Sequence, residues 1–119
     1  MGRILIAEDN PKTLEILKKS LQPLGHEIDT ARDGEEALKK LQKAAYDLLV
    51  TDLVMPGRTG MELLEALTEL ASKIPILICS AYVTPDAIKG LVRGRRMEIV
   101  TKPFKASDLA ASARKLLPP

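Results

Sequence analysis

The residues of this sequence that could carry out chemistry stand where its short apolar runs end. Glu8 and Asp9 follow the first apolar run, Asp52 ends a later one, and Ser80 and Lys102 end two more. An isolated carboxylate is costly to bury unless a positive partner neutralises it. Asp52 at the mouth of an apolar strand therefore predicts that other charged groups gather around it.

Together these side chains have the composition of a phosphoryl-transfer site. Carboxylate oxygens without a nearby His or Cys select a hard divalent cation. A site as open as this one suits Mg2+. Lys102 supplies a positive charge for an incoming anion, and the Ser80 hydroxyl can donate to a phosphoryl oxygen. A carboxylate held among such groups can attack phosphorus and form an aspartyl phosphate. Each residue alone has an ordinary structural explanation, whereas the combination indicates phosphoryl transfer.

These residues can meet only if the apolar runs form neighbouring parallel strands. Strands are predicted at residues 3–8, 26–30, 46–52, 75–80 and 97–101, and nearly continuous apolar runs are typical of strands covered on both faces. Amphipathic segments separate them. The alternation predicts an α/β fold with a doubly wound, five-stranded parallel sheet, whose sites form at the carboxyl ends of the strands.

The segments between the strands carry helix start signals. Asn10 before Pro11 is predicted to cap the first helix, and Asp33 with Glu36 resembles a capping box at the start of the second. Thr59 with Glu62 and Thr84 before Pro85 are predicted to start the third and fourth helices. A fifth helix is predicted at about 106–116, with Leu109, Ala113 and Leu116 on one side. The first helix is expected to bury one face, formed by Leu14, Leu17, Leu21 and Leu24.

Length and composition indicate one globular domain over residues 1–119, with Pro118-Pro119 as an end or the start of a linker. No apolar run is long enough to cross a membrane. The one cysteine, Cys79, fits a reducing cytoplasm and is expected to be buried and inert.

The charge of the chain is unevenly distributed. Residues 84–119 carry 8 basic and 3 acidic side chains, although the whole chain has a net charge of only +2. A basic face could meet an acidic partner or could simply be solvated. Few aromatic residues interleave with the basic ones, so we expect no direct nucleic-acid binding.

The sequence resembles the receiver domain of two-component response regulators over essentially its full length. The resemblance rests on Glu8-Asp9, Asp52 within "DLVMPGRTGMELL", Ser80-Ala81 and Lys102-Pro103-Phe104. It implies a flavodoxin-like (βα)5 fold with strand order 2-1-3-4-5, and a signalling phosphoacceptor rather than an enzyme acting on other substrates. Within this family, the sequence resembles the chemotaxis-type receivers, which consist of a single domain.

The resemblance also implies roles for individual residues. Asp52 would accept a phosphoryl group from a sensor histidine kinase or a phosphotransfer protein. Glu8, Asp9, Asp52 and the backbone carbonyl of Val54 would hold Mg2+. Ser80 and Lys102 would bind the phosphoryl group, and the bond before Pro103 is often cis in this family. The switched surface would lie around the fourth helix, the fifth strand and the fifth helix, and would act on a downstream protein or a linked output domain.

Three positions depart from the family pattern. Ile99 stands where receivers often have an aromatic residue, so signalling there must be muted or different, with Tyr82 as a candidate substitute. Arg95 and Arg96 replace a Gly-Ala pair. Together with Tyr82, Lys89, Arg93 and Ile99 they form what we call the candidate signalling surface, in which the lysine and arginines could make a basic patch. Val54 and Tyr82 are bulky at positions that influence hydrolysis, which predicts slow self-dephosphorylation.

Three other interpretations compete with the phosphorylation switch. An interaction module with the receiver fold could act without phosphorylation, although the intact set of site residues argues against it. A flavodoxin-like cofactor carrier would need a phosphate-binding loop where Glu8-Asp9 stands. An aspartate-dependent phosphatase would need a second acid at the position of Val54.

Overall fold

The computed structural model describes residues 2–52, 62, 65–66, 73–80 and 96–117. Its strands form one parallel sheet of five strands in the order β2-β1-β3-β4-β5, as the family resemblance implies. The strands are β1 (Arg3–Ala7), β2 (Glu27–Ala31), β3 (Leu48–Thr51), β4 (Ile76–Ser80) and β5 (Met97–Thr101). The described helices are α1 (Pro11–Leu21), the short 3-10 helix η1 (Gln22–Leu24), α2 (Gly34–Lys43) and α5 (Ala106–Leu116).

The predicted strands are confirmed, with differences at their ends. The first strand ends at Ala7, so Glu8 lies just beyond the ladder, and β3 ends at Thr51, just before Asp52. β2 extends one residue past the predicted end, to Ala31. Every residue of β3 and β4 is buried, as expected of strands covered on both faces.

The predicted start of the first helix is confirmed at α1. The Asn10 side chain accepts hydrogen bonds from the backbone N–H groups of Lys12 and Thr13, and Pro11 occupies the first helical position. The predicted leucine face of the first helix is wrong at its last residue, because α1 stops at Leu21. Pro23 follows in η1, so Leu24 lies outside α1.

The cap of α2 is close to the predicted capping box. Asp33 accepts from the backbone N–H of Glu36 at 2.8 Å, but the Glu36 carboxylate returns to the N–H of Arg32 instead of that of Asp33. The predicted starts of the third and fourth helices, at Thr59 and Thr84, lie outside the described residues.

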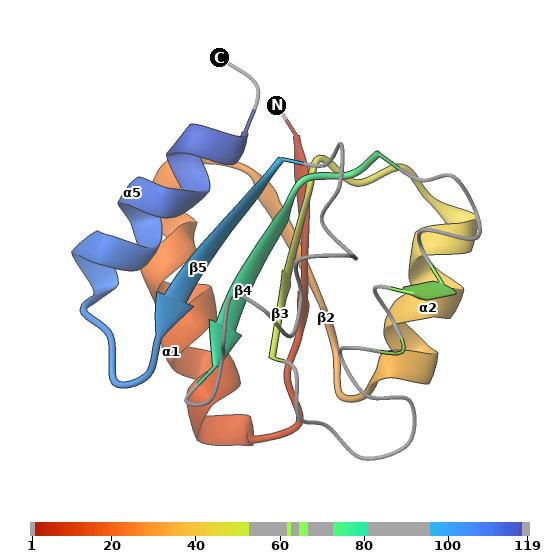
Figure 1. Cartoon of the computed structure of the whole chain (residues 1–119), viewed down its shortest axis with the longest axis horizontal. Helices are drawn as coiled ribbons and strands as arrows, with labels where there is room; N and C mark the ends of the chain where they lie inside the picture. Colours follow the sequence, from red (N-terminus) through yellow and green to blue (C-terminus); the bar gives the residue numbers. More distant parts are fainter. Residues whose placement is uncertain (1, 53–61, 63–64, 67–72, 81–95, 118–119) are drawn as a thin grey trace.

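The sheet separates two apolar layers (Figure 1). On one face, α1 and α5 bury Leu17, Leu21, Leu109, Ala113 and Leu116 against the strands. On the other face, α2 buries Ala37 against Leu5 and Leu49. The α5 residues are those that the sequence pattern placed on one side of the helix. In the described part of the chain no helix is long and apolar enough to cross a membrane.

The register of the strands brings the candidate site residues to one edge. Ala7 pairs with Thr51, and Ser80 pairs with Thr101. The residues that follow these pairs, Glu8, Asp52 and Lys102, therefore leave the sheet at its carboxyl edge, which is the lower edge in Figure 1.

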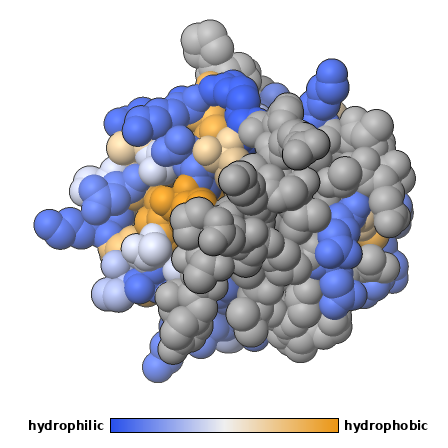
Figure 2. All heavy atoms as spheres, in the orientation of Figure 1, coloured by the Kyte–Doolittle hydropathy of each residue, from blue (hydrophilic) through white to orange (hydrophobic). Residues whose placement is uncertain are grey.

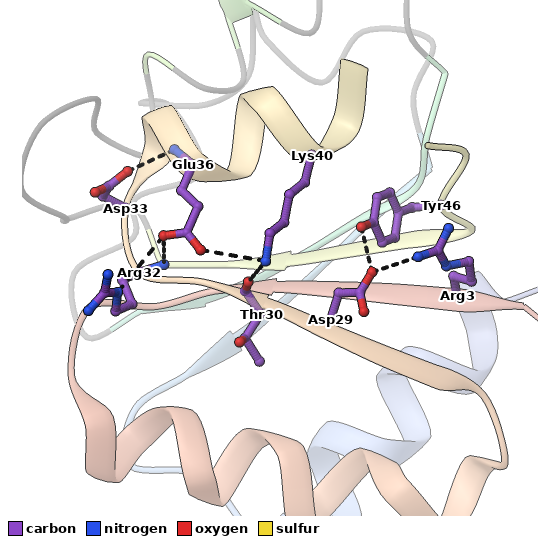
Figure 3. Close-up of polar contacts among 8 residues, drawn as sticks. All are labelled: Arg3, Asp29, Thr30, Arg32, Asp33, Glu36, Lys40 and Tyr46. Carbon is purple, nitrogen blue, oxygen red and sulfur yellow. Dashed lines mark hydrogen bonds and ion pairs between the residues drawn. The ribbon is translucent and has the colours of Figure 1, made fainter. Parts of the chain in front are cut away.

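A separate polar network lies between β2, β1 and the segment before β3 (Figure 3). The Asp29 carboxylate accepts from the Tyr46 hydroxyl at 2.6 Å and from the Arg3 guanidinium at 2.9 Å. The Arg3 guanidinium also lies 5.0 Å from the centre of the Tyr46 ring. Lys40 of α2 donates to the backbone carbonyl of Thr30, which ties α2 to strand β2.

The start of β1 is held by two side chains. The N–H of Gly2 donates to His26 Nδ1 at 2.7 Å, and the N–H of Arg3 donates to Asp47 Oδ2 at 2.8 Å. A Cβ atom on Gly2 would overlap that same Asp47 oxygen, so the Asp47 carboxylate would have to move to admit a side chain.

Candidate functional site

The ammonium group of Lys102 joins two carboxylates at the carboxyl edge of the sheet. Lys102 Nζ lies 2.6 Å from Asp52 Oδ2 and 3.0 Å from Glu8 Oε1. The side chains of Glu8 and Asp52 are 2% and 11% exposed, and that of Lys102 is 23% exposed. Residues separated by 94 and 50 positions in the sequence are thus brought into direct contact.

Backbone hydrogen bonds place these three residues. The N–H of Glu8 donates to the Ala31 carbonyl at 3.0 Å, and the N–H of Asp52 donates to the Ala7 carbonyl at 3.3 Å. The N–H of Lys102 donates to the Ser80 carbonyl at 3.0 Å, and the Lys102–Pro103 bond is cis, as expected from the family. Each chemical group therefore continues a strand whose position the sheet fixes.

Burial and ion pairing shift the pKa values of Glu8 and Lys102 in opposite directions. Burial raises the pKa of Glu8, although the hydrogen bonds from Lys102 and from the Asn10 N–H lower it in part. Burial alone would lower the pKa of Lys102, but its hydrogen bonds to Asp52 and Glu8 raise that pKa above its ordinary value. The ammonium is held charged by its two partners.

Both oxygens of Glu8 accept a hydrogen bond. Oε1 accepts from Lys102, and Oε2 accepts from the N–H of Asn10 at 3.2 Å. Asn10 in turn caps α1, so a continuous set of hydrogen bonds joins the candidate phosphoacceptor Asp52 to the first turn of that helix. The sequence had suggested the cap but not the bond from Asn10 to Glu8.

The fit of the site to Mg2+ rests on its donor chemistry. Asp9 is exposed beside Glu8, and Asp52 lies across the edge, so the available donors are carboxylate oxygens of the kind that Mg2+ prefers. Among the described residues no three acidic, His or Cys side chains converge in a ready metal-binding group. The fourth expected donor, the carbonyl of Val54, lies outside the described residues.

Ser80 ends β4 next to this group and is buried, with 1% exposure. Cys79, its neighbour, is also buried, and burial raises the pKa of its thiol to about 12. The expectation of a buried cysteine is confirmed, and a raised thiol pKa disfavours the reactive thiolate near neutral pH.

Two members of the candidate signalling surface can be placed. Ile99 on β5 is one of the two exposed large apolar residues in the described part of the chain, at 38% exposure. In Figure 2 an apolar patch lies over β5, with hydrophilic side chains on its outer side. Arg96 is exposed at the start of β5 and donates to the Lys115 carbonyl near the end of α5. Tyr82, Lys89, Arg93 and Arg95 lie outside the described residues.

One feature beside the site gave only a faint signal in the sequence. Thr51 is a polar residue inside the apolar run of β3, and its buried hydroxyl donates to the carbonyl of Asp52 at 2.8 Å. A threonine is common in strands, so its type alone does not distinguish packing from a specific hydrogen bond.

The fold and this arrangement are those of a signalling receiver, and comparison with known families agrees. Residues 4–114 match the response regulator receiver domain. The chain belongs to that family.

Similar proteins include both longer regulators and single receivers. The chain is 33% identical over 117 residues to the uncharacterized transcriptional regulatory protein YkoG of Bacillus subtilis, covering 98% of this chain and 51% of that protein. It is 36% identical to the transcriptional regulatory protein TcrA of Mycobacterium tuberculosis, covering 96% of this chain and 45% of that protein. The chain thus spans about half the length of the curated relatives it matches.

Among solved structures, the response regulator protein TrrA of Thermotoga maritima, in complex with Mg2+ and BeF, is 37% identical. Its TM-score is 0.85, and the match covers 98% of this chain and 100% of that one. The chemotaxis response regulator CheY4 of Vibrio cholerae is 31% identical with a TM-score of 0.86, covering 98% and 99% of the two chains.

Proposed function

We propose that this receiver domain accepts a phosphoryl group on Asp52 and works as a Mg2+-dependent switch. The observation that carries the proposal is the placement of Lys102, whose ammonium contacts the carboxylates of both Asp52 and Glu8. A lysine fixed beside the acceptor can bind the oxygens of an incoming phosphoryl group without reorganisation, which is how preorganised charge lowers a barrier.

The proposed donor is a phosphohistidine of a sensor histidine kinase or a phosphotransfer protein. A carboxylate oxygen of Asp52 forms a bond to phosphorus while the bond from phosphorus to the histidine nitrogen breaks, and that nitrogen keeps the electron pair. The Lys102 ammonium, already beside the acceptor, then pairs with the phosphoryl oxygens, and the hydroxyl of Ser80 donates to one of them.

Asp9 and Asp52, with the carbonyl of Val54, would hold the metal ion. Bound Mg2+ would offset the negative charge of the carboxylates and of the phosphoryl oxygens. Glu8 would be the fourth ligand of the ion, because each of its oxygens accepts one hydrogen bond, from Lys102 or from Asn10, and keeps a second lone pair.

Phosphorylation would bias the surface formed by the fourth helix, β5 and α5. Ile99 and Arg96 lie on this surface, and Arg96 bonds to the end of α5. The target is either a separate protein or a linked output domain, and the names and lengths of relatives such as YkoG support the second arrangement. The domain itself would not bind nucleic acid.

We place this signalling in the cytoplasm, where kinases of this type present their phosphohistidine. Apart from phosphotransfer, the domain would catalyse only the slow hydrolysis of its own aspartyl phosphate, since Val54 and Tyr82 are bulky at the positions that influence the attacking water.

Intact mass after incubation with acetyl phosphate tests the acceptor. We expect wild type to gain one phosphoryl group with Mg2+ and none with EDTA, and Asp52→Asn to gain none. Asp108→Asn is the matched control, because Asp108 is an exposed carboxylate in the first turn of α5. It should gain a phosphoryl group like the wild type.

Each other outcome has a defined meaning. A gain in Asp52→Asn would assign phosphorylation to a different carboxylate. No gain in folded wild type, with Mg2+ present, would favour a receiver-fold interaction module that acts without phosphorylation.

A further inference from the structure

The backbone of Asp52 is held on both sides, although the residue lies beyond the last ladder pair of β3. On one side, its N–H donates to the Ala7 carbonyl at 3.3 Å, which is long for a backbone hydrogen bond. On the other side, the hydroxyl of Thr51 donates to the Asp52 carbonyl at 2.8 Å. The shorter of these two bonds therefore comes from a side chain.

Packing does not explain why this hydroxyl is present. Thr51 is 1% exposed, and the alternation along β3 places it on the same face as Leu49, in the layer with Ala7 and Ile78. A valine has nearly the same shape and would avoid the cost of burying a hydroxyl. The bond to the Asp52 carbonyl is the property that threonine adds.

We infer that Thr51 is a positioning residue for the phosphoacceptor, an inference that rests on the proposed function of Asp52. Its hydroxyl fixes the orientation of the peptide that follows Asp52 and so the direction in which the Asp52 side chain leaves the strand. That direction places Asp52 Oδ2 at 2.6 Å from the Lys102 ammonium. Phosphoryl transfer depends on such alignment, since small misplacements of a reacting group reduce its rate.

Paired substitutions separate positioning from packing. Thr51→Val keeps the shape and removes the donor, whereas Thr51→Ser keeps the donor and removes a methyl group. The rate of phosphorylation by acetyl phosphate at saturating Mg2+ is measured for each by intact mass. We expect Thr51→Val to slow phosphorylation about fivefold, the equivalent of one lost hydrogen bond, and Thr51→Ser to keep the rate within about twofold of wild type.

Ser20→Ala provides a matched control. Ser20 is also buried, and its hydroxyl donates to a backbone carbonyl, that of Ile16, at 2.7 Å, but in α1 away from the site. Its loss should leave the phosphorylation rate unchanged. Urea unfolding of each variant checks that the slower rate of Thr51→Val does not follow from lost stability. If Thr51→Val does not fold, Thr51→Ala removes the same hydroxyl.

The possible results are distinct. Equal rates for Thr51→Val and wild type would overturn the positioning role while leaving Asp52 as the acceptor. A slow Thr51→Ser, or an equally slow Ser20→Ala, would also overturn it, since the hydroxyl at position 51 would then not decide the rate. If folded wild type takes up no phosphoryl group, the proposed function and this role fail together.

Discussion

Replacing Lys102 with methionine would leave two buried carboxylates without their shared cation. The methionine side chain is similar in length to that of lysine, so Lys102→Met removes the charge with little change in packing. Glu8 is almost fully buried. Of the two hydrogen-bond donors to its carboxylate described above, only the Asn10 N–H would remain. The carboxylates of Glu8 and Asp52 would then face each other across the position of the ammonium.

The size of the effect follows from the burial of the three groups. Breaking a fully buried ion pair on one side costs about 3–5 kcal/mol of unfolding free energy. Lys102 is 23% exposed, so water can partly replace it. We therefore expect Lys102→Met to lower the stability by about 2–3 kcal/mol in the absence of metal.

Urea unfolding in EDTA at neutral pH measures this loss. Adding Glu8→Gln to Lys102→Met should recover about 1 kcal/mol, because one of the two unpaired charges is removed. Lys115→Met is the matched control: that side chain is 69% exposed and lies 3.9 Å from Glu98, so its removal should change stability by less than about 0.5 kcal/mol. A loss in Lys102→Met no larger than in the control, or no recovery in the double variant, would refute the reasoning.

Three further predictions concern the start of β1, the Asp29 network and the cap of α1. Gly2→Ala should lower stability by about 1 kcal/mol, because the new Cβ atom displaces the Asp47 carboxylate and breaks its hydrogen bond; urea unfolding should show a smaller loss when Asp47→Ala is already present. Burial and the hydrogen bond to Asp29 raise the pKa of Tyr46 to about 12. The stability that Tyr46 contributes is therefore complete below the ordinary tyrosine pKa and is lost as pH rises through the raised one; absorbance titration should show a late phenol transition that is absent in Tyr46→Phe, and its persistence there would contradict the assignment. Asn10→Ala should cost about 1 kcal/mol through the lost cap, and Asn10→Asp should retain most of it; thermal unfolding that treats both variants alike would contradict the capping role.

Much of the fold could be predicted because local and global signals agree. The apolar runs that became β3 and β4 are fully buried, and the cap at Asn10 starts α1 where expected. The convergence of Asp52 and Lys102 followed from one rule, that parallel strands end at the same edge of the sheet.

What the sequence did not predict depends on tertiary distances. The bond from Asn10 to Glu8 requires the turn between β1 and α1 to fold back on its own carboxylate. The network of Asp29 with Arg3 and Tyr46 joins residues whose separations in the sequence carry no periodic signal. The early end of α1 at Leu21 is different, because its cause is local: Pro23, and Gly25, which adopts a positive φ of 81°. The leucine periodicity continued past the point where the backbone could follow it.

The position of β1 inside the sheet has a consequence for the folding reaction. β1 pairs with β2 on one side and with β3 on the other, so Arg3 lies opposite Glu27 and Ile4 lies opposite Leu48. Neither pairing is a hairpin, and each closes a long loop before the strands gain any contact. The sheet cannot grow by zipping from a local turn. Its folding barrier is therefore dominated by chain entropy, and the domain should fold more slowly than a helical bundle of equal length.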